Sequence, residues 1–328
     1  MSESQRTGMY LQRCREGHPL RLCGEPFRAR YPVALGTAIG ENGRRTRIRR
    51  RTIAQAGMKK FEMPEVRHII AVASGKGGVG KSTVSANLAL ALAAEGYRTA
   101  LLDADIYGPS QALMLGVPEG TRPDVADDLL QPIVAHGLQV MSMGFITRDR
   151  TPAIWRGPMA SGALQQMLTQ VAWQNVDYMI VDYPPGTGDI QLTLAQHVPM
   201  SGAVVVTTPQ DIALLDARKA IEMFRKVHVP VLGIVENMST HVCSSCGHVE
   251  PVFGAGGGEQ IAADYETEVL GRLPLAMSIR EQSDGGTPPL VADPEGEVSQ
   301  TFRSMATRIV AAVETSATDA PTISILDD

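Results

Sequence analysis

The sequence predicts an α/β fold, in which a mostly parallel sheet carries helices on both faces of a single main domain. Three observations favour this fold. From Pro64 onward, apolar β-branched runs alternate with helical patterns. The runs are almost continuously apolar, as is typical of parallel strands that are buried on both faces. Polar motifs directly follow the ends of these runs, where ligands bind to open parallel sheets.

The expected elements follow one another in chain order. We predict strands at 68–74, 99–105, 138–144, 176–183, 202–208 and 229–238. Helical patterns lie between them, among them 158–173, 189–198 and 211–227, and the last helix is expected over 295–314. Strands that alternate with helices in this way predict βαβ units and a parallel sheet.

The segment SGKGGVGKST, residues 74–83, lies between the first strand and a strong helix former. It matches the phosphate-binding pattern G-x-x-x-x-G-K-[ST] of P-loop proteins, in the strand–loop–helix context that the pattern requires. Glycines let backbone N–H groups form an anion nest at the helix N-terminus. We therefore predict an ATP site, with Lys81 on the phosphates and Ser82 on Mg²⁺. The expected contacts are Gly75, Lys76, Gly77, Gly78, Val79, Gly80, Lys81, Ser82 and Thr83.

Carboxylates follow two further strands. Asp103 and Asp105 end the run TALLDAD and suit a role in organising Mg²⁺ and water, with a turn or helix-capping pair as the alternative. Asp182 ends the run at 176–183 and is followed by Pro-Pro-Gly, which indicates a Walker B carboxylate that holds Mg²⁺. Asn237 also follows a strand, and its amide is expected either at the adenine edge or in a turn.

The segment HVCSSCGH, residues 241–248, has the spacing of a metal-binding knuckle. Two thiolates, Cys243 and Cys246, do not complete the four-ligand shell of Zn²⁺ or of an Fe–S cluster. His241 and His248 could complete a zinc site, and a redox dithiol is a further alternative. A two-fold dimer would instead bring two pairs together, which is the geometry for a shared [4Fe–4S] cluster.

The charge is unevenly distributed. The first 57 residues hold 12 Arg, no Lys and 4 acidic residues, which leaves 18 basic and 31 acidic residues in the rest. An acidic globular part is an unsuitable partner for nucleic acid. We expect 1–57 to be a disordered Arg-rich extension that includes Cys14 and Cys23, 58–315 to be the folded domain, and 316–328 to be a disordered acidic tail. The sequence contains no run of 18 apolar residues, so we expect no membrane-spanning helix. No export signal is recognisable.

Taken together, SGKGGVGKST, LLDADIYGPS, WRGPM, VDYPPGTGDIQL, VENMS and CSSCG resemble the Mrp/ApbC family of iron–sulfur cluster carrier ATPases over about residues 64–290. This family belongs to the deviant Walker A group of P-loop proteins. The resemblance implies a homodimer with ATP near the interface, in which Lys76 reaches the partner's nucleotide. It further implies that Lys81 and Ser82 contact phosphate and Mg²⁺, that Asp105 orients water, that Asp182 is the Walker B residue, and that Cys243 and Cys246 bridge a labile cluster between subunits.

The function expected from these features is ATP-dependent transfer of an Fe–S cluster from a donor scaffold to apo-proteins. The expected location is the cytoplasm, or the mitochondrial matrix if residues 1–57 are a targeting segment. A positioning ATPase of the ParA/MinD type is an alternative, but the chain ends in an acidic segment rather than a basic amphipathic helix. An ATPase with a structural zinc is the other alternative. A nitrogenase-reductase-like electron donor would need cysteines far apart in sequence.

Overall fold

The computed structural model describes residues 60–146, 157–243 and 245–318. The predictions for residues 1–57, for Cys14 and Cys23, and for most of the acidic tail lie outside the described residues. Within the described part, no helix combines the length and the apolar character needed to cross a membrane.

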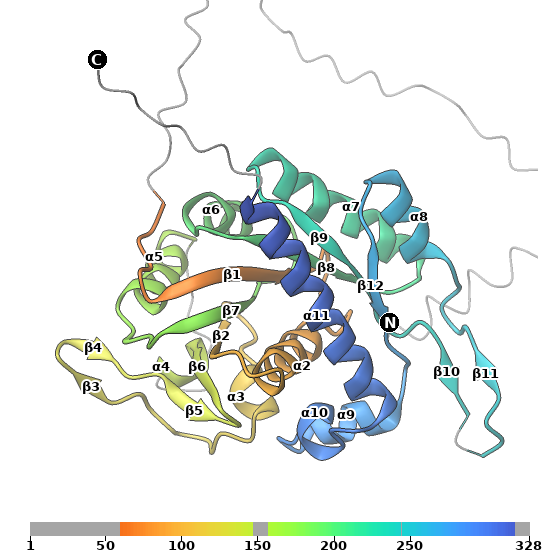
Figure 1. The fold of residues 1–328 in the computed structure, drawn as a ribbon, viewed down its shortest axis with the longest axis horizontal. Helices are drawn as coiled ribbons and strands as arrows, with labels where there is room; N and C mark the ends of the chain where they lie inside the picture. The colour runs from red at the N-terminus through yellow and green to blue at the C-terminus, as the bar shows by residue number, and fades with distance from the viewer. Residues whose placement is uncertain (1–59, 147–156, 244, 319–328) are drawn as a thin grey trace, which may run out of the picture. The chain divides into compact units, whose positions relative to one another are not determined.

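An eight-stranded sheet forms the centre of the fold, in the order β12-β9-β8-β1-β7-β2-β6-β5 (Figure 1). Every neighbouring pair is parallel except β5 with β6. The strands are β1 (Val66–Ala73), β2 (Thr99–Asp103), β5 (Ile133–Ala135), β6 (Leu138–Ser142), β7 (Val176–Asp182), β8 (Gly202–Thr207), β9 (Val231–Glu236) and β12 (Val269–Arg272). The predicted α/β fold with a mostly parallel sheet is confirmed.

Helices cover both faces of this sheet (Figure 1). On one face, α2 (Lys81–Ala94) packs against α11 (Glu297–Thr318) and α10 (Pro289–Ala292). The other face carries α5 (Gly157–Thr169) with α6 (Asp189–His197), and α7 (Asp211–Lys226) with α8 (Gly257–Asp264). The remaining described helices are α3 (Gln111–Met114), α4 (Met143–Ile146) and α9 (Met277–Asp284). The sheet is thereby enclosed, which is why its strands are apolar on both sides.

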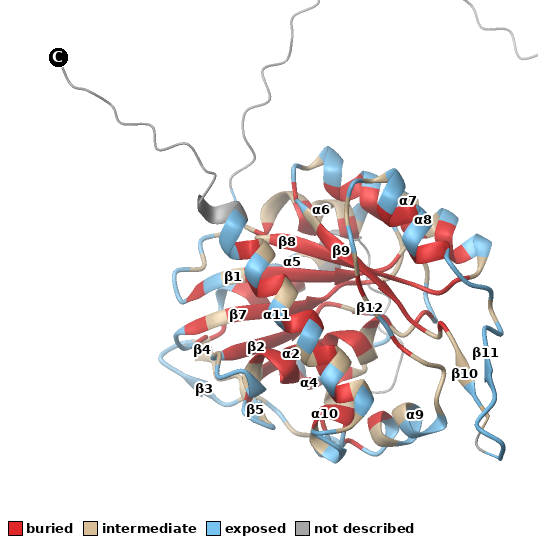
Figure 2. Cartoon of the chain, turned by 45° about the vertical axis from the view of Figure 1, so that its right-hand side comes forward, coloured by how far each residue is buried: buried red, intermediate tan, exposed pale blue. Residues whose placement is uncertain are grey.

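The core lies where the central strands meet the covering helices (Figure 2). Ile70, Ala71 and Val72 in the middle of β1 are fully buried, and so is Ile180 in β7. Helix α2 is buried almost all round, because its Ala- and Leu-rich sequence fits between the sheet and α11. The phosphate-loop segment therefore connects two of the most deeply buried elements.

Two helices, α5 and α11, end four residues away from the predicted positions. Helix α5 ends at Thr169 rather than at residue 173. Helix α11 ends at Thr318 rather than at residue 314, so residues 316–318, expected in the tail, are helical. The reason is that no Gly or Pro interrupts the chain between Gly296 and Pro321, and without a stop signal the helix continues.

The sequence patterns also missed several short elements. Strand β12 has four residues and one of them is Gly271, so it carried no strand pattern of its own. Two hairpins were likewise not predicted: β3 (Val125–Ala126) with β4 (Leu129–Leu130), and β10 (His241–Val242) with β11 (Val249–Glu250). The second hairpin extends away from the sheet and carries the Cys-x-x-Cys segment (Figure 1).

Candidate functional site

The phosphate-binding loop connects β1 to α2. Gly78 and Gly80 both have φ of +82°, a left-handed conformation that glycine adopts without strain, and Gly80 is the N-cap of α2. At Gly75 the constraint is close packing, because a Cβ there would lie 2.0 Å from the Asp216 carbonyl oxygen of α7. The loop borders a cavity of about 240 Å³, which Asp105, Ser110 and Pro185 also line. Six of the nine predicted contacts line this cavity at the carboxyl end of the sheet, and the other three, Gly75, Lys76 and Val79, do not.

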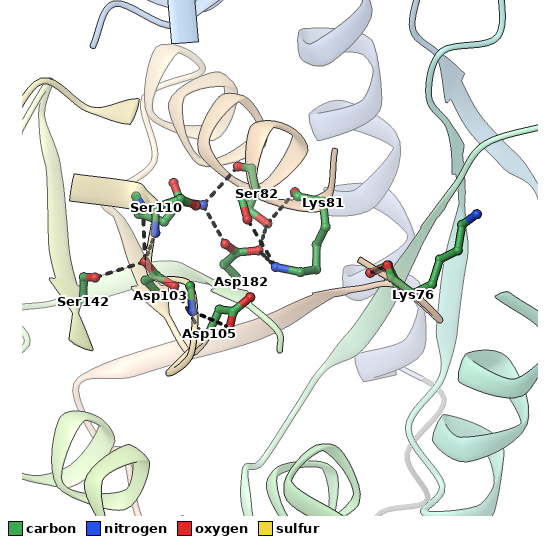
Figure 3. Close-up of polar contacts among 12 residues, drawn as sticks. Lys76, Lys81, Ser82, Asp103, Asp105, Ser110, Ser142 and Asp182 are labelled. Carbon is green, nitrogen blue, oxygen red and sulfur yellow. Dashed lines mark hydrogen bonds and ion pairs between the residues drawn. The ribbon is translucent and has the colours of Figure 1, made fainter. Parts of the chain in front are cut away.

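Lys81 and Asp182 form a buried ion pair beside this cavity (Figure 3). The Lys81 Nζ atom lies 2.5 Å from Asp182 Oδ1 and 3.3 Å from Ser82 Oγ. Two further donors hold the same carboxylate. Ser85 Oγ donates to Oδ1 at 2.9 Å, and Gln111 Nε2 donates to Oδ2 at 2.8 Å. The predicted phosphate lysine and the predicted Walker B carboxylate are thus brought into direct contact.

Asp103 is fully buried and does not line the cavity. Its Oδ2 accepts the Ser110 and Gln111 backbone N–H groups and the Ser142 hydroxyl at 3.0–3.1 Å. Its Oδ1 accepts the Asp105 N–H at 3.2 Å. Burial, and then the charge of Asp182, raise the pKa of Asp103 to about 7. Four donors occupy the Asp103 oxygens in this structure, as the capping alternative expects, and its Mg²⁺ role stays a prediction.

Asp105 has the accessible position that Asp103 lacks. It is half-buried, it lines the cavity, and its Oδ1 accepts the Gly108 N–H at 3.2 Å. Of the two carboxylates in the motif, Asp105 is thus the one that can reach a molecule in the cavity. Asp105 lies two residues after Asp103, whose Oδ1 accepts the Asp105 N–H and so holds the start of the loop that carries Asp105.

The two lysines of the loop point in different directions. Lys76 is half-buried, and Figure 3 shows its side chain extending away from Lys81, Ser82 and Asp182. Its backbone carbonyl accepts the Ser74 hydroxyl at 2.8 Å, which fixes the main chain while the ammonium extends outward. Lys76 therefore does not share the phosphate site of its own chain in this structure.

Asn237 follows β9 and is buried against the phosphate loop. Its Nδ2 donates to the Val79 carbonyl at 2.8 Å, and its Oδ1 accepts the Met238 N–H at 3.0 Å. The contact leaves no room at the neighbouring glycine, since a Cβ on Gly80 would lie 2.1 Å from Nδ2. In this structure the amide, which was expected at the adenine edge or in a turn, holds the loop through a contact between residues 158 positions apart that local sequence does not reveal.

The Pro-Pro-Gly segment after β7 lies against the phosphate loop. The Gly186 N–H donates to the Ser74 carbonyl at 3.0 Å, and Gln191 Nε2 of α6 donates to the Pro185 carbonyl at 2.6 Å. Tyr183, which precedes the prolines, is fully buried and donates its hydroxyl to the Gln191 carbonyl at 3.2 Å. This segment is therefore fixed from both ends at the edge of the cavity.

Cys243 and Cys246 lie in the connection between β10 and β11. The Cys243 N–H donates to the His248 carbonyl at 2.9 Å, and the Gly247 N–H donates to the Cys243 carbonyl at 2.8 Å. Hydrogen bonds from the backbone of Ser245 and then of Cys246 lower the pKa of the Cys243 thiol. Cys243 is half-buried and Cys246 is exposed. N–H groups that donate to the sulfur stabilise the thiolate, which is the form of cysteine that binds metals.

Within the described part of the chain, the cysteine pair has no third ligand nearby. Among the residues that the structure describes, no group of three His, Cys, Asp or Glu side chains could hold a metal ion. His241 directs Nδ1 to the Leu275 carbonyl at 3.1 Å, which anchors the hairpin to the body of the protein. His248 is exposed. The described part of one chain therefore offers two sulfur ligands on an accessible hairpin.

Several residues of the site carried no sequence signal. Ser85 lies in an Ala- and Leu-rich helix, Gln111 follows a Gly-Pro-Ser turn, and Ser142 ends a strand. As single polar residues they are indistinguishable from caps and turns by local pattern. All three contact Asp103 or Asp182, so their role depends on which strands lie side by side.

Comparisons with known proteins agree with this geometry. The family model described as ParA, NUBPL iron-transfer P-loop NTPase matches residues 65–310. An iron–sulfur cluster carrier protein of Pseudomonas fragi is 62% identical over 245 residues, which are 74% of this chain and 85% of that protein. The iron–sulfur cluster transfer protein NUBPL of Mus musculus is 46% identical over 281 residues, 85% of this chain and 88% of that protein.

Solved structures show the same fold. The nucleotide-binding protein of Archaeoglobus fulgidus in complex with ADP is 37% identical with a TM-score of 0.63, and the match covers 73% of this chain and 93% of that one. The cell division ATPase MinD of Pyrococcus furiosus is 24% identical with a TM-score of 0.56, covering 74% and 98% of the two chains, and supports the fold alone. The chain therefore belongs to the ParA/NUBPL iron-transfer family of P-loop NTPases, which includes the iron–sulfur cluster carriers of the Mrp/ApbC type.

Proposed function

We propose that this protein is an ATP-hydrolysing carrier that binds a [4Fe–4S] cluster between two copies of the chain and transfers it to apo-proteins. The observation that carries the proposal is the Cys243–Cys246 knuckle, whose backbone N–H groups lower the pKa of the Cys243 thiol on an exposed hairpin. Two accessible cysteine ligands per chain suit a cargo that is accepted and released.

The need for a dimer follows from the number of ligands. A [4Fe–4S] cluster is held by four cysteine thiolates, and the described part of the chain offers two. A two-fold axis beside the hairpin would supply the other pair from the same surface of a second copy. The names of the relatives, iron–sulfur cluster carrier and transfer proteins, support this cargo over a structural zinc.

The nucleotide site would act as the switch. Ser82 lines the cavity and Asp182 is connected to it through the Lys81 ammonium, so the two side chains would fit a Mg²⁺ ion, which would neutralise charge on the phosphate oxygens. Lys81 would exchange Asp182 for the phosphates. Asp105 would orient the water that attacks the γ-phosphorus as the bond to the leaving ADP oxygen breaks. Lys76 of the partner subunit would approach from across the interface.

Anaerobic reconstitution with iron and sulfide tests the cargo. The wild-type protein should take up about two iron atoms per chain, the ratio for one four-iron cluster per dimer. A Cys243→Ala, Cys246→Ala double variant should take up none above background. The matched control is Cys14→Ala with Cys23→Ala, which should load as the wild type does. Equal iron uptake by the two double variants would refute the cluster site.

The same samples separate the cluster from zinc. A [4Fe–4S] cluster gives a broad visible absorption that requires both iron and sulfide, and loading should shift the protein from monomer to dimer in sedimentation. Zinc binding by the hairpin without any sulfide-dependent absorption would favour the structural-zinc alternative. Transfer is then measured as the activation of an apo-enzyme that needs a [4Fe–4S] cluster, mixed with the loaded protein.

A further inference from the structure

We propose that Gln111 is a positioning residue for ATP hydrolysis. It holds the Asp182 carboxylate and the end of the Asp105 loop in one arrangement, so that Asp182 remains oriented when Lys81 leaves it for the phosphates. The inference rests on the proposed nucleotide chemistry of this site, and it assigns a role to a residue that no motif identified.

Gln111 is the first residue of α3 and is fully buried. Its Nε2 donates to two acceptors, the Ser82 carbonyl at 3.0 Å and Asp182 Oδ2 at 2.8 Å. Both partners can only accept, so the amide must direct its NH₂ group toward them. One side chain therefore connects the phosphate loop to the end of β7.

The main chain of the same residue makes the second connection. The Gln111 N–H donates to Asp103 Oδ2 at 3.1 Å, and Asp103 Oδ1 accepts the Asp105 N–H at 3.2 Å. The loop that presents Asp105 to the cavity is thus held by Asp103 near its start and at its end. Because Gln111 is the residue at that end, displacement of its side chain would alter both Asp182 and the Asp105 loop.

Charge explains why such a residue is needed. Asp182 has no solvent exposure, and in this structure its charge is balanced by Lys81 at 2.5 Å. When Lys81 binds phosphate, the proposed Mg²⁺ would take over its charge, and the carboxylate would still have to be held in place while buried near a second carboxylate, Asp103. A buried charge without partners is costly, and hydrogen bonds to an ionised group are the strong kind. The donors that remain on Asp182 are Ser85 Oγ and Gln111 Nε2.

The other end of the amide has an unused capacity. Gln111 Oε1 is buried and has no hydrogen-bond partner among the described residues. Buried acceptors are normally paired, so an orphaned one beside a proposed Mg²⁺–phosphate site fits a donor that arrives with the ligand, such as a water of the hydrated ion. Gln111 would therefore support the proposed metal site through its contacts with Ser82 and Asp182.

The test compares Gln111→Leu with Gln111→Met, which keeps the length and flexibility of glutamine without its amide. Two quantities are measured for each: the Mg²⁺ concentration that gives half-maximal ATP turnover, and the affinity for ADP by calorimetry with Mg²⁺ and with EDTA. Loss of a supporting contact typically costs 10–100-fold in metal affinity, so we expect at least about a tenfold rise in the Mg²⁺ requirement. ADP affinity in EDTA should stay within about twofold of the wild type.

Gln139→Leu is the matched control, because the side chain of this glutamine on β6 hydrogen-bonds only with Gln174 among the described residues and lies outside the cavity. It should leave both measurements unchanged. If either Gln111 variant weakens ADP binding equally with and without Mg²⁺, or if neither variant folds, the role of Gln111 is structural and the inference is overturned. An unchanged Mg²⁺ requirement in both variants would overturn it as well.

Asp182→Asn distinguishes this inference from the proposed function. If Asp182→Asn leaves the Mg²⁺ requirement unchanged, the proposed Mg²⁺ site itself is wrong, and the inference falls with it. If Asp182→Asn raises the requirement while both Gln111 variants behave as the wild type does, only the role of Gln111 is refuted. A rise in all three variants supports both.

Discussion

The Lys81 ammonium lies 2.5 Å from Asp182 Oδ1, and the two side chains are 6% and 0% exposed. The lysine that the motif assigns to phosphate is therefore bound to the carboxylate that the next motif assigns to Mg²⁺. If Lys81 binds phosphate and Asp182 binds Mg²⁺ as proposed, binding of a nucleotide would replace this internal ion pair by two new ones. The exchange would connect occupancy of the cavity to three elements. Strand β7 and helix α2 contain the two residues of the pair, and α3 contacts it through Gln111.

Removal of the lysine should affect both catalysis and stability. Lys81→Ala should abolish ATP turnover and lower the free energy of unfolding by about 3 kcal/mol, because it leaves a buried carboxylate without its cation. Urea unfolding of the nucleotide-free protein measures the second effect. The control is Lys76→Ala, whose half-buried side chain extends away from the site, and which should change stability by less than about 0.5 kcal/mol. Unchanged turnover in Lys81→Ala would refute the placement of the phosphate site.

Lys76 should act on the nucleotide of the partner subunit. Lys76→Ala alone and Lys81→Ala alone should both be inactive. When they are mixed, each mixed dimer has one site with Lys81 intact and with Lys76 supplied by the other subunit. Random pairing then restores up to about a quarter of wild-type turnover. If Lys76 acts within its own chain, every site in the mixture lacks one lysine, and the mixture stays inactive.

The phosphate loop should tolerate a methyl group at one glycine and not at another. Gly80→Ala forces φ of +82° on alanine and brings Cβ to 2.1 Å from Asn237 Nδ2, so we expect a loss of about 2 kcal/mol in stability and no nucleotide binding. At Gly77 nothing lies within 4 Å of the position that a Cβ would take. Gly77→Ala is thus the matched control and should retain wild-type stability. Thermal unfolding with and without ADP measures both effects.

Asn237 should support the loop without selecting the base. Asn237→Ala removes the donor to the Val79 carbonyl, so it should weaken the binding of ATP and GTP by similar factors, about fivefold for the loss of about 1 kcal/mol. Competition binding with the two nucleotides measures the ratio. A selective loss of ATP affinity would restore the adenine-edge role that the sequence suggested.

Asp103 should make stability depend on pH. Its pKa of about 7 in the folded protein exceeds the value near 3.9 of an unfolded chain, so between these values the folded state binds more protons. Stability should therefore fall as pH rises from about 4 to 7 and level off above, by as much as about 4 kcal/mol. In Asp103→Asn this part of the slope should disappear. Urea unfolding across the pH range checks it, and identical slopes in both proteins would contradict the assignment.

The fold and the phosphate loop were predictable because their signals are local. The pattern of Gly75, Gly80, Lys81 and Ser82 specifies an anion nest between a strand and a helix. The composition of the flanking segments predicts that strand and that helix. The place of Asp182 at the end of a strand was predictable for the same reason, since it ends an apolar run, and its Walker B role stays a prediction. Short elements such as β12 and the β10–β11 hairpin escaped, because two to four residues carry too little pattern.

The roles of polar residues were less predictable. Asp103 and Asp105 are equivalent in the sequence, yet one caps α3 from within the core while the other lines the cavity. Asn237 was expected at a ligand or in a turn, and in this structure it holds Val79. These outcomes depend on which residues of distant segments meet a side chain, and a local pattern contains no such information.

The sequence by itself determined the α/β alternation, the phosphate loop and the Cys-x-x-Cys pair, because each is encoded by residues close together in the chain. Only the tertiary structure decided that β2, β7 and β1 lie side by side, and hence that Lys81, Asp103, Gln111 and Asp182 share one buried network. The physical reason is that lateral strand order is set by packing of the whole core. The charges that meet at the carboxyl ends of those strands are a consequence of that order.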